Sequence, residues 1–436
     1  MFAYYIKLAL LALRRTPVLS TLMVLAIALG LATAMTSFTV LYRMSANPIP
    51  HKSEVLYAVQ VDNWDAEQAF DRERNLPPDQ LTHRDSRQLL AAAEAPRQVA
   101  MYRTSMVVVP EDKSLNPQTR AVRAASTDFF AMFDTPFLHG GPWTKAEDDQ
   151  SARVAVIGRE LNERVFKGEN SVGRLLRLDQ EQFRIIGVLD TWKLQPLFYD
   201  LNAGALAGPE EIFIPFSVAT QLEKDVNGSV NCFEPMGEGY RGLIDSECIM
   251  SQFWVELPDA ASRDRYLAFL DRYTDEQRAL GRFERPNNNR LVPVMQWLTQ
   301  NEVIPDDTYI FVGVGAAFLI VCLLNATGLL LAKFLRKTGE IGLRRALGAH
   351  RGAVFVQHLV ESGLIGLLGA ATGLLLTLGG LALVRSLWPD YGEVAVLDAP
   401  LFGLMLLLAV GGALLSGAYP AWRACRVAPA SQLKTN

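Results

Sequence analysis

Four long apolar runs divide this chain into membrane-type and water-facing sections. The first run lies between Arg15 and Arg43, and three more follow near the C-terminus at 308–332, 362–384 and 399–422. Each holds about 23 to 27 residues, and a helix needs roughly 20 to cross the hydrocarbon core of a bilayer. The pattern predicts one transmembrane helix, a large polar section and then three clustered transmembrane helices.

The polar section, residues 43–307, carries interleaved strand and helix signals. Strands are expected at 56–61, 105–109, 153–157, 175–178, 183–189 and 253–257, and helices at 85–93, 159–166, 217–223 and 260–280, with a short helix opened by Ser126. This order predicts an α+β domain.

The same pattern divides the chain into nine consecutive segments. They are an interfacial N-terminal helix at 1–16, transmembrane helix 1 at 17–42, the polar domain at 43–307, transmembrane helix 2 at 308–332, a connecting segment at 333–351, transmembrane helix 3 at 352–384, a short loop at 385–398, transmembrane helix 4 at 399–422 and a tail at 423–436. Since the domain leaves and re-enters the membrane once, we expect a membrane-proximal part at about 43–120 and 250–307, and a distal part at about 120–250.

The residues before Pro17 allow more than one structure. Apolar residues alternate there with Lys7, Arg14 and Arg15, which fits either an interfacial amphipathic helix or an early start of transmembrane helix 1. A cleaved signal peptide is a further alternative, because Ala32–Ala34 resembles a cleavage site. The apolar run continues past that site and is longer than a usual signal core, which favours a retained membrane helix.

Charge is divided unevenly along the chain. The formal net charge is −4, whereas residues 43–307 hold 29 basic and 41 acidic residues, a net charge of −12. Lys and Arg gather instead at both termini and at 333–351, and short basic connections stay in the cytoplasm. We therefore expect a multi-pass membrane protein with cytoplasmic N- and C-termini and with residues 43–307 outside the cytoplasm. The predicted fold class is a membrane protein of four transmembrane α-helices (1+3), with a large α+β periplasmic domain inserted between the first and second.

Two cysteines of that domain, Cys232 and Cys248, lie close in sequence. A periplasmic location permits a disulfide between them, and the surrounding turn-rich stretch has little apolar pattern to hold it otherwise. Two free thiols are the alternative, because spacing alone does not fix the geometry of a bond.

The sequence lacks the common catalytic motifs. Its five histidines are scattered, and no HExxH zinc motif, GxSxG nucleophile motif or GxxxxGK[ST] phosphate loop occurs. We expect no catalytic residue, cofactor or metal in this chain, and the acidic domain argues against nucleic-acid binding. If ATP drives this protein, another chain binds it.

The segment 333–351 carries the strongest local signal. Its candidate docking residues are Glu340, Ile341, Leu343, Arg344, Arg345 and Leu347. Glu340 and Arg344 are four positions apart and can pair on one helical face, and Gly348 can end that helix. The simpler interpretation is a charged turn that obeys the positive-inside rule. That interpretation does not explain the apolar residues, which suit docking onto a cytoplasmic partner.

Small residues recur at four-residue spacing in three of the transmembrane helices. The candidate packing residues are Gly30, Gly369, Gly373 and Gly412. Such residues let helices approach closely, and we expect them to include a contact with a second subunit, although glycine is also frequent in membrane helices by chance. Glu361, near the start of transmembrane helix 3, is a candidate functional residue, but its side chain can equally cap the helix or extend to the membrane surface. Asn325 is expected to join two helices.

At these residues the chain resembles the MacB/FtsX-type family of ABC transporter permeases, without a fused ATPase domain. The stretches that carry the resemblance are Leu8–Pro17, Ala26–Gly30, Phe129–Gly140, Val154–Gly158, Ser171–Arg174, Phe183–Gly187, Gly339–Ala349 with Glu361, and Tyr419–Ala424 followed by Pro429 and Ala430. The most specific of them is Gly339–Ala349.

The resemblance implies a multi-pass protein of the bacterial inner membrane. It further implies a non-catalytic permease subunit that relays the motion of a separate ABC ATPase dimer to its periplasmic domain, for export of a periplasmic substrate. ATP and magnesium would be bound by the ATPase, which the candidate docking residues would contact. Further implied partners are a second permease, identical or related, a periplasmic adaptor and an outer-membrane channel. A lipoprotein-extracting or cell-wall-hydrolase-activating permease is the alternative within the family. A membrane-anchored periplasmic enzyme is the alternative from another class.

Overall fold

A computed structural model describes residues 2–192, 194–392 and 394–426 of the chain. The described residues form two compact units. The membrane unit holds those up to Ser45 and from Ile304 onward, and the sheet unit holds Ala46–Val303. The division falls where the apolar runs end, because apolar helices and a polar α+β domain bury different kinds of surface.

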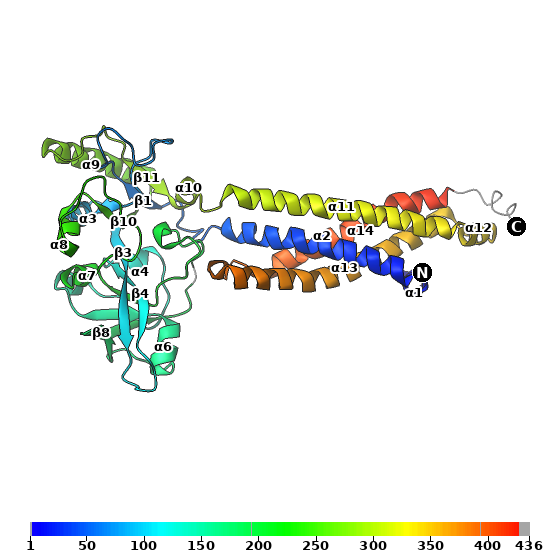
Figure 1. The fold of residues 1–436 in the computed structure, drawn as a ribbon, viewed down its shortest axis with the longest axis horizontal. Helices are drawn as coiled ribbons and strands as arrows, with labels where there is room; N and C mark the ends of the chain where they lie inside the picture. Colours follow the sequence, from blue (N-terminus) through cyan, green and yellow to red (C-terminus); the bar gives the residue numbers. More distant parts are fainter. Residues whose placement is uncertain (1, 193, 393, 427–436) are drawn as a thin grey trace. The chain divides into compact units, whose positions relative to one another are not determined.

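The membrane unit is a bundle of helices. Its helices are α1 (Phe2–Arg15), α2 (Pro17–Met44), α11 (Asp306–Arg336), α12 (Thr338–Ala346), α13 (Arg351–Leu387), the 3₁₀ turn η2 (Pro389–Tyr391) and α14 (Ala399–Cys425). Figure 1 shows α2, α11, α13 and α14 lying lengthwise beside one another. In the described ranges, these four are long and apolar enough to cross a membrane. The predicted 1+3 arrangement is confirmed.

Two of the bundle helices continue beyond their apolar runs. α11 extends through charged residues to Arg336, and α13 begins at Arg351. The expected connection at 333–351 is therefore mostly helical, because it contains the end of α11 and all of α12. Basic side chains are favourable in the last turn of a helix, where they face its negative pole.

α1 and α2 are separate helices. Thr16, between them, has φ −131° and ψ 63°, which is not a helical conformation. Pro17 occupies the first turn of α2, where its missing N–H removes no hydrogen bond. The alternative of one continuous helix from the N-terminus is therefore wrong.

The sheet unit is built on one mixed sheet of eleven strands within the described residues. Its strands are β1 (Leu56–Gln60), β2 (Leu81–Thr82), β3 (Arg97–Val109), β4 (Gln118–Ala125), β5 (Phe137–Gly140), β6 (Val154–Ile157), β7 (Leu175–Leu178), β8 (Glu181–Leu189), β9 (Ile212–Pro215), β10 (Ile249–Glu256) and β11 (Arg290–Pro293). The main order is β11-β1-β10-β3-β4-β9-β6-β8-β5, with β2 beside β10, and β7 beside β3 and β8.

The expected proximal and distal parts are two halves of this one sheet. β11, β1, β10 and β3 come from the parts assigned near the ends of the domain, and β9, β6, β8 and β5 from the part between them. The antiparallel pairing of β3 with β4 joins the halves, from Met101 opposite Ala125 to Val108 opposite Gln118. The expected boundary near residue 120 falls within β4, which is paired with β3.

Short helices surround the sheet. They are α3 (His83–Ala92), α4 (Phe129–Met132), α5 (Lys145–Asp149), α6 (Arg159–Phe166), η1 (Leu201–Ala203), α7 (Phe216–Gln221), α8 (Gly239–Asp245), α9 (Ala260–Ala279) and α10 (Val294–Gln300). The expected helices at 85–93, 159–166, 217–223 and 260–280 correspond to α3, α6, α7 and α9. The residue that precedes α4 is Asp128 rather than Ser126.

Each face of the sheet has its own apolar core. Successive residues of a strand point to opposite faces, and Tyr57 and Val59 of β1 join one core whereas Leu56 and Ala58 join the other. Because strands covered on both faces lose the alternation of apolar and polar residues, the short fully buried strand β9 left no signal in the sequence analysis.

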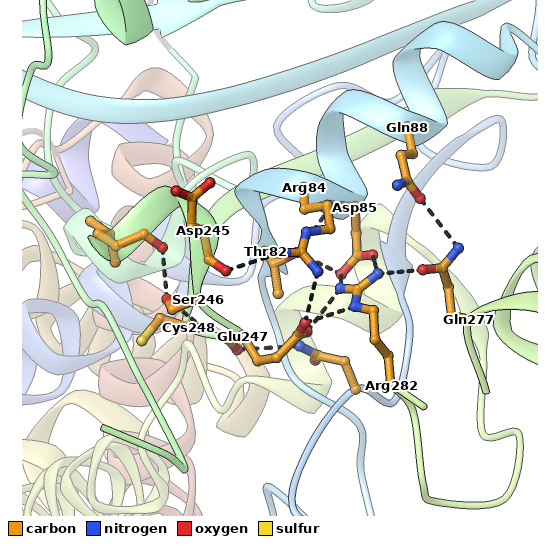
Figure 2. Close-up of polar contacts among 12 residues, drawn as sticks. Thr82, Arg84, Asp85, Gln88, Asp245, Ser246, Glu247, Cys248, Gln277 and Arg282 are labelled. Carbon is orange, nitrogen blue, oxygen red and sulfur yellow. Dashed lines mark hydrogen bonds and ion pairs between the residues drawn. The ribbon is translucent and has the colours of Figure 1, made fainter. Parts of the chain in front are cut away.

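Arg282 links three segments of the sheet unit (Figure 2). Its guanidinium lies 2.9 Å from Asp85 of α3 and 2.7 Å from Glu247, and it donates a hydrogen bond to Gln277 of α9. Burial lowers the pKa of Arg282, but the hydrogen bonds and charges of Glu247 and Asp85 outweigh burial and raise it above its ordinary value. The arginine is thus held charged between the fully buried Asp85 and the partly buried Glu247.

A disulfide joins Cys232 to Cys248, the residue after Glu247 in this network. It closes the loop that connects α7, through α8, to β10. Near its other end, Phe233 packs on Trp64 with the ring centroids 5.3 Å apart. The bond therefore holds a turn-rich segment against the rest of the unit.

Removing this disulfide is expected to destabilise the sheet unit by about 3 kcal/mol, the loop-closure value for cysteines 16 residues apart. The variant Cys232→Ser/Cys248→Ser should unfold at a lower temperature than the wild type, as followed by tryptophan fluorescence. A reductant should lower the wild type to the same temperature and leave the variant unchanged. Unfolding of the oxidised wild type and the variant at one temperature would contradict this prediction.

Candidate functional site

The candidate site lies in the membrane unit where α11, α12 and α13 follow one another. Lys337 separates α11 from α12, and its backbone N–H bonds to the carbonyl of Phe334. α12 ends at Ala346, and Gly348 then adopts φ +100°, a conformation that side chains other than glycine rarely allow. α12 is therefore a short helix of its own between two sharp changes of direction.

The apolar residues of the α12 segment, residues 338–347, have two environments. Ile341 is only 5% exposed and packs in the bundle core with Phe334 and Val354. Leu343 and Leu347 are 62% and 81% exposed. Ile341 therefore anchors the segment to the bundle and is not available for docking, contrary to our expectation, whereas the two leucines are accessible.

The charged residues of the α12 segment also bind the bundle. Arg344 pairs with Glu340 at 2.6 Å and donates a hydrogen bond to Gln357 of α13 at 3.0 Å. Arg345 donates to the carbonyl oxygen of Cys425 at the end of α14, at 3.2 Å. The expected Glu340–Arg344 pair is thus present, and the segment is attached to α13 and α14 by side chains.

A buried cluster of charges lies immediately beside α12. The Lys333 ammonium lies 2.8 Å from the Glu361 carboxylate and donates to the Ser20 hydroxyl at 3.1 Å. Lys337 and His358 each approach the same carboxylate to 3.6 Å. Lys333 and Glu361 are both 1% exposed. We call these five residues the charge cluster, and they connect α2, α11 and α13.

Three expectations about polar residues of the membrane unit are wrong. Lys333 belongs to the bundle interior rather than to a basic loop, because Glu361 supplies its counter-charge. Glu361 lies ten residues into α13 and is buried, so it neither caps the helix nor snorkels to the membrane surface. Asn325 of α11 is exposed on the bundle surface instead of joining two helices of this chain.

The predicted packing glycines all lie at close contacts between helices of this chain. A Cβ atom added to Gly30 would lie 2.9 Å from Cys322 of α11, and one at Gly369 would lie 2.8 Å from Ile27 of α2. At Gly373 it would lie 3.1 Å from Leu31, and at Gly412 3.0 Å from Leu323. Each of these four glycines therefore packs against another helix of its own chain.

Sequence reasoning missed most members of the charge cluster. Ser20 and His358 gave no signal as isolated polar residues in apolar stretches. Glu361 did give one, since an acid inside a membrane helix requires a partner. Among the described residues, no group of three or more His, Cys, Asp and Glu side chains is placed to hold a metal.

Two family models match the chain. The MacB-like periplasmic core domain matches residues 20–272, and the FtsX-like permease C-terminal domain matches residues 312–429. The second match contains all of α12, α13 and α14, and the first extends from α2 across most of the sheet unit. The candidate site is therefore at the start of the FtsX-like part.

Several proteins named as exporters are similar to this chain. The macrolide export ATP-binding/permease protein MacB of Syntrophobacter fumaroxidans is 26% identical over 339 residues, covering 70% of this chain and 46% of that protein. The pyoverdine export ATP-binding/permease protein PvdT of Pseudomonas aeruginosa is 25% identical over 319 residues, covering 71% and 41%. The chain thus corresponds to less than half the length of these relatives.

Among solved structures, the periplasmic region of MacB from Actinobacillus actinomycetemcomitans aligns with 59% of this chain and 96% of its own, at 14% identity and a TM-score of 0.37.

The matches to the two family models together extend from α2 to the end of α14. The chain therefore belongs to the MacB/FtsX-type family of ABC transporter permeases.

Proposed function

We propose that this chain is the permease subunit of an exporter in which a separate ATPase moves the α12 segment, and that the bundle transmits this movement to the periplasmic domain. The observation that carries the proposal is that one face of the α12 segment is attached to the bundle while another face is exposed. Ile341, Arg344 and Arg345 fix it to the bundle, while Leu343 and Leu347 remain exposed. A partner bound to the two leucines would therefore pull on α13 and α14.

The exposed leucines suit a protein partner. An amphipathic helix docks through apolar side chains spaced three or four residues apart, and Leu343 and Leu347 have that spacing. Fully burying one leucine side chain contributes about 1.5–3 kcal/mol. The pair can thus supply a large share of the binding energy of a transient interface.

We place the α12 segment in the cytoplasm. The supporting observation is charge: the 333–351 stretch holds Lys and Arg with Glu340 as its only acid, and short basic connections stay inside. This orientation puts both termini in the cytoplasm and the sheet unit in the periplasm. ATP and magnesium would bind only to the partner ATPase.

A second permease, identical or related, is the other partner that we propose. The supporting observation is that α11 is the least buried of the four long helices and exposes Asn325 on its surface. An amide facing lipid is unfavourable, and a hydrogen bond to a neighbouring helix would satisfy it. A periplasmic adaptor and an outer-membrane channel would complete the exporter.

The double variant Leu343→Asp/Leu347→Asp tests the coupling. We expect its affinity for the ABC ATPase that co-purifies with the wild-type chain to fall at least about 100-fold, since the loss of two buried leucines amounts to roughly 3–6 kcal/mol. Binding is measured with the purified full-length permease in detergent. Both leucines are exposed, so the thermal stability of the variant should equal that of the wild type.

Two further variants give this experiment its controls. Leu280→Asp changes an equally exposed leucine of the sheet unit, 75% exposed, and should leave ATPase binding unchanged. Ile341→Asp changes the buried anchor and should lower the thermal stability of the bundle. Wild-type ATPase affinity in the Leu343→Asp/Leu347→Asp variant would rule out this docking surface.

A further inference from the structure

The membrane unit contains a groove between α1, α12 and α13, at the end of the bundle where Figure 1 shows α1 and α12. Its α1 side consists of Leu8, Leu11, Ala12 and Arg15, which lie three or four positions apart and therefore share one face of that helix. We call it the α1–α13 groove. Its volume of about 210 Å³ is small for a drug-sized ligand, whose sites begin at about 300 Å³, but leaves room for a charged headgroup.

Arg15 brings a positive charge without a counter-charge to the α1–α13 groove. Its side chain is exposed at the end of α1 and forms no ion pair with any residue that the structure describes. Glu340, the acid that lines the same groove, pairs instead with Arg344 at 2.6 Å. The planar guanidinium of a free arginine binds phosphate or carboxylate oxygens through two parallel hydrogen bonds. Arg15 therefore favours an anionic ligand.

Lys337 brings a second positive charge to the groove. Its ammonium lies 3.6 Å from the Glu361 carboxylate, but Lys333 approaches the same oxygen to 2.8 Å. Two ammonium groups thus share one carboxylate, which leaves one positive charge uncompensated. The Lys333 side chain is buried, whereas that of Lys337 is 22% exposed and lines the groove. The uncompensated charge is therefore accessible from the groove.

The apolar residues of α1 indicate where the anion comes from. Leu8 and Leu11 line the groove beside Arg15, and Tyr4, Leu10 and Leu11 are exposed on the helix. A helix with exposed apolar residues and a basic face lies at the surface of a membrane, with its basic residues among the lipid headgroups. Basic pockets between membrane helices at this depth bind anionic headgroups. The expected anion is therefore a lipid phosphate.

We propose that the α1–α13 groove binds the headgroup of an anionic phospholipid. Arg15 and Lys337 would bind the phosphate oxygens, and an acyl chain would lie along Leu11 and the exposed face of α1. The lipid would thereby link α1 to α12 and α13. Leu343 and Leu347 do not line the groove, so this proposal stands or falls independently of docking at the α12 segment.

Native mass spectrometry of the full-length chain in detergent tests the site, because it counts bound lipids and measures the affinity of each. Dioleoyl phosphatidylglycerol is anionic, whereas dioleoyl phosphatidylcholine has the same acyl chains and a choline group that neutralises its phosphate. We expect the first phosphatidylglycerol to bind at least about tenfold more tightly than the first phosphatidylcholine. Equal affinity for the two lipids would overturn the proposal. Displacement of phosphatidylglycerol by an equal concentration of glycerol phosphate, which lacks acyl chains, would also overturn it, because the site would then bind a soluble anion.

Variants locate the lipid. Arg15→Gln should weaken the first phosphatidylglycerol at least about fivefold and leave phosphatidylcholine binding unchanged, and Lys337→Gln should act in the same direction. Arg14→Gln is the matched control, since it removes the same charge one residue earlier, at an exposed position outside the groove, and should weaken phosphatidylglycerol much less. Equal weakening in Arg14→Gln and Arg15→Gln would show a general effect of surface charge and contradict the site. Unchanged phosphatidylglycerol affinity in both Arg15→Gln and Lys337→Gln would contradict it as well.

Discussion

Replacing Arg282 by methionine is expected to lower the free energy of unfolding of the sheet unit by about 3–5 kcal/mol. The arginine binds Asp85 and Glu247, and the Asp85 side chain is completely buried. Methionine keeps apolar volume but supplies no charge, so the side-chain donors that Asp85 retains among the described residues are the hydroxyls of Thr82 and Tyr273. A buried carboxylate without its cation costs far more than a lost surface ion pair.

Thermal unfolding followed by tryptophan fluorescence measures this loss, because five of the seven tryptophans belong to the sheet unit. The expected fall in Tm is roughly 6–20 °C. Arg84→Met is the matched control visible in Figure 2, since Arg84 also pairs with Glu247, at 3.6 Å, but is 41% exposed. Its expected loss is below about 1 kcal/mol. Equal falls in Tm for Arg282→Met and Arg84→Met would show that the buried arginine stabilises the sheet unit no more than the exposed one does.

Replacing Lys333 by methionine is expected to destabilise the membrane unit, also by about 3–5 kcal/mol. Glu361 would remain buried in the bundle, and an unpaired charge inside a membrane is expensive. Lys337 and His358, each 3.6 Å from the carboxylate, offset part of this loss. The observable is the fraction of detergent-solubilised chain that stays monodisperse after heating.

A rescue variant separates charge pairing from packing. Lys333→Met/Glu361→Gln removes both charges and should recover most of the lost stability, since replacing a whole buried ion pair by neutral groups is often nearly neutral. Arg336→Met, at an exposed position of α11 four residues before Glu340, should have little effect. If the double variant is as unstable as Lys333→Met alone, pairing with Glu361 is not the cause.

Within the α12 segment, the sequence could not tell which apolar residues are buried and which are exposed. Ile341, Leu343 and Leu347 are chemically similar, and nothing in a nine-residue helix ranks them. Only the position of α12 on α13 and α14 buries Ile341 and leaves the two leucines exposed. The same placement uses Arg345 at the end of α14, a contact across 80 residues of sequence.

The partner of the buried Glu361 was likewise not predictable from the sequence. Glu361 was conspicuous because one acid in an apolar helix is costly wherever it points. Its partner could not be identified from sequence, because Lys333 follows an apolar run and has the local pattern of any positively charged helix end.

The sequence by itself determined the four membrane helices, the α+β domain between the first and second, and the family, because each depends on the length and composition of continuous segments. The tertiary structure decided the strand order, the pairing of Lys333 with Glu361 and the exposure of Leu343 and Leu347. Those features depend on which distant surfaces meet. The physical reason is that burial and desolvation act between segments, so the energy of a side chain depends on neighbours that its local pattern does not encode.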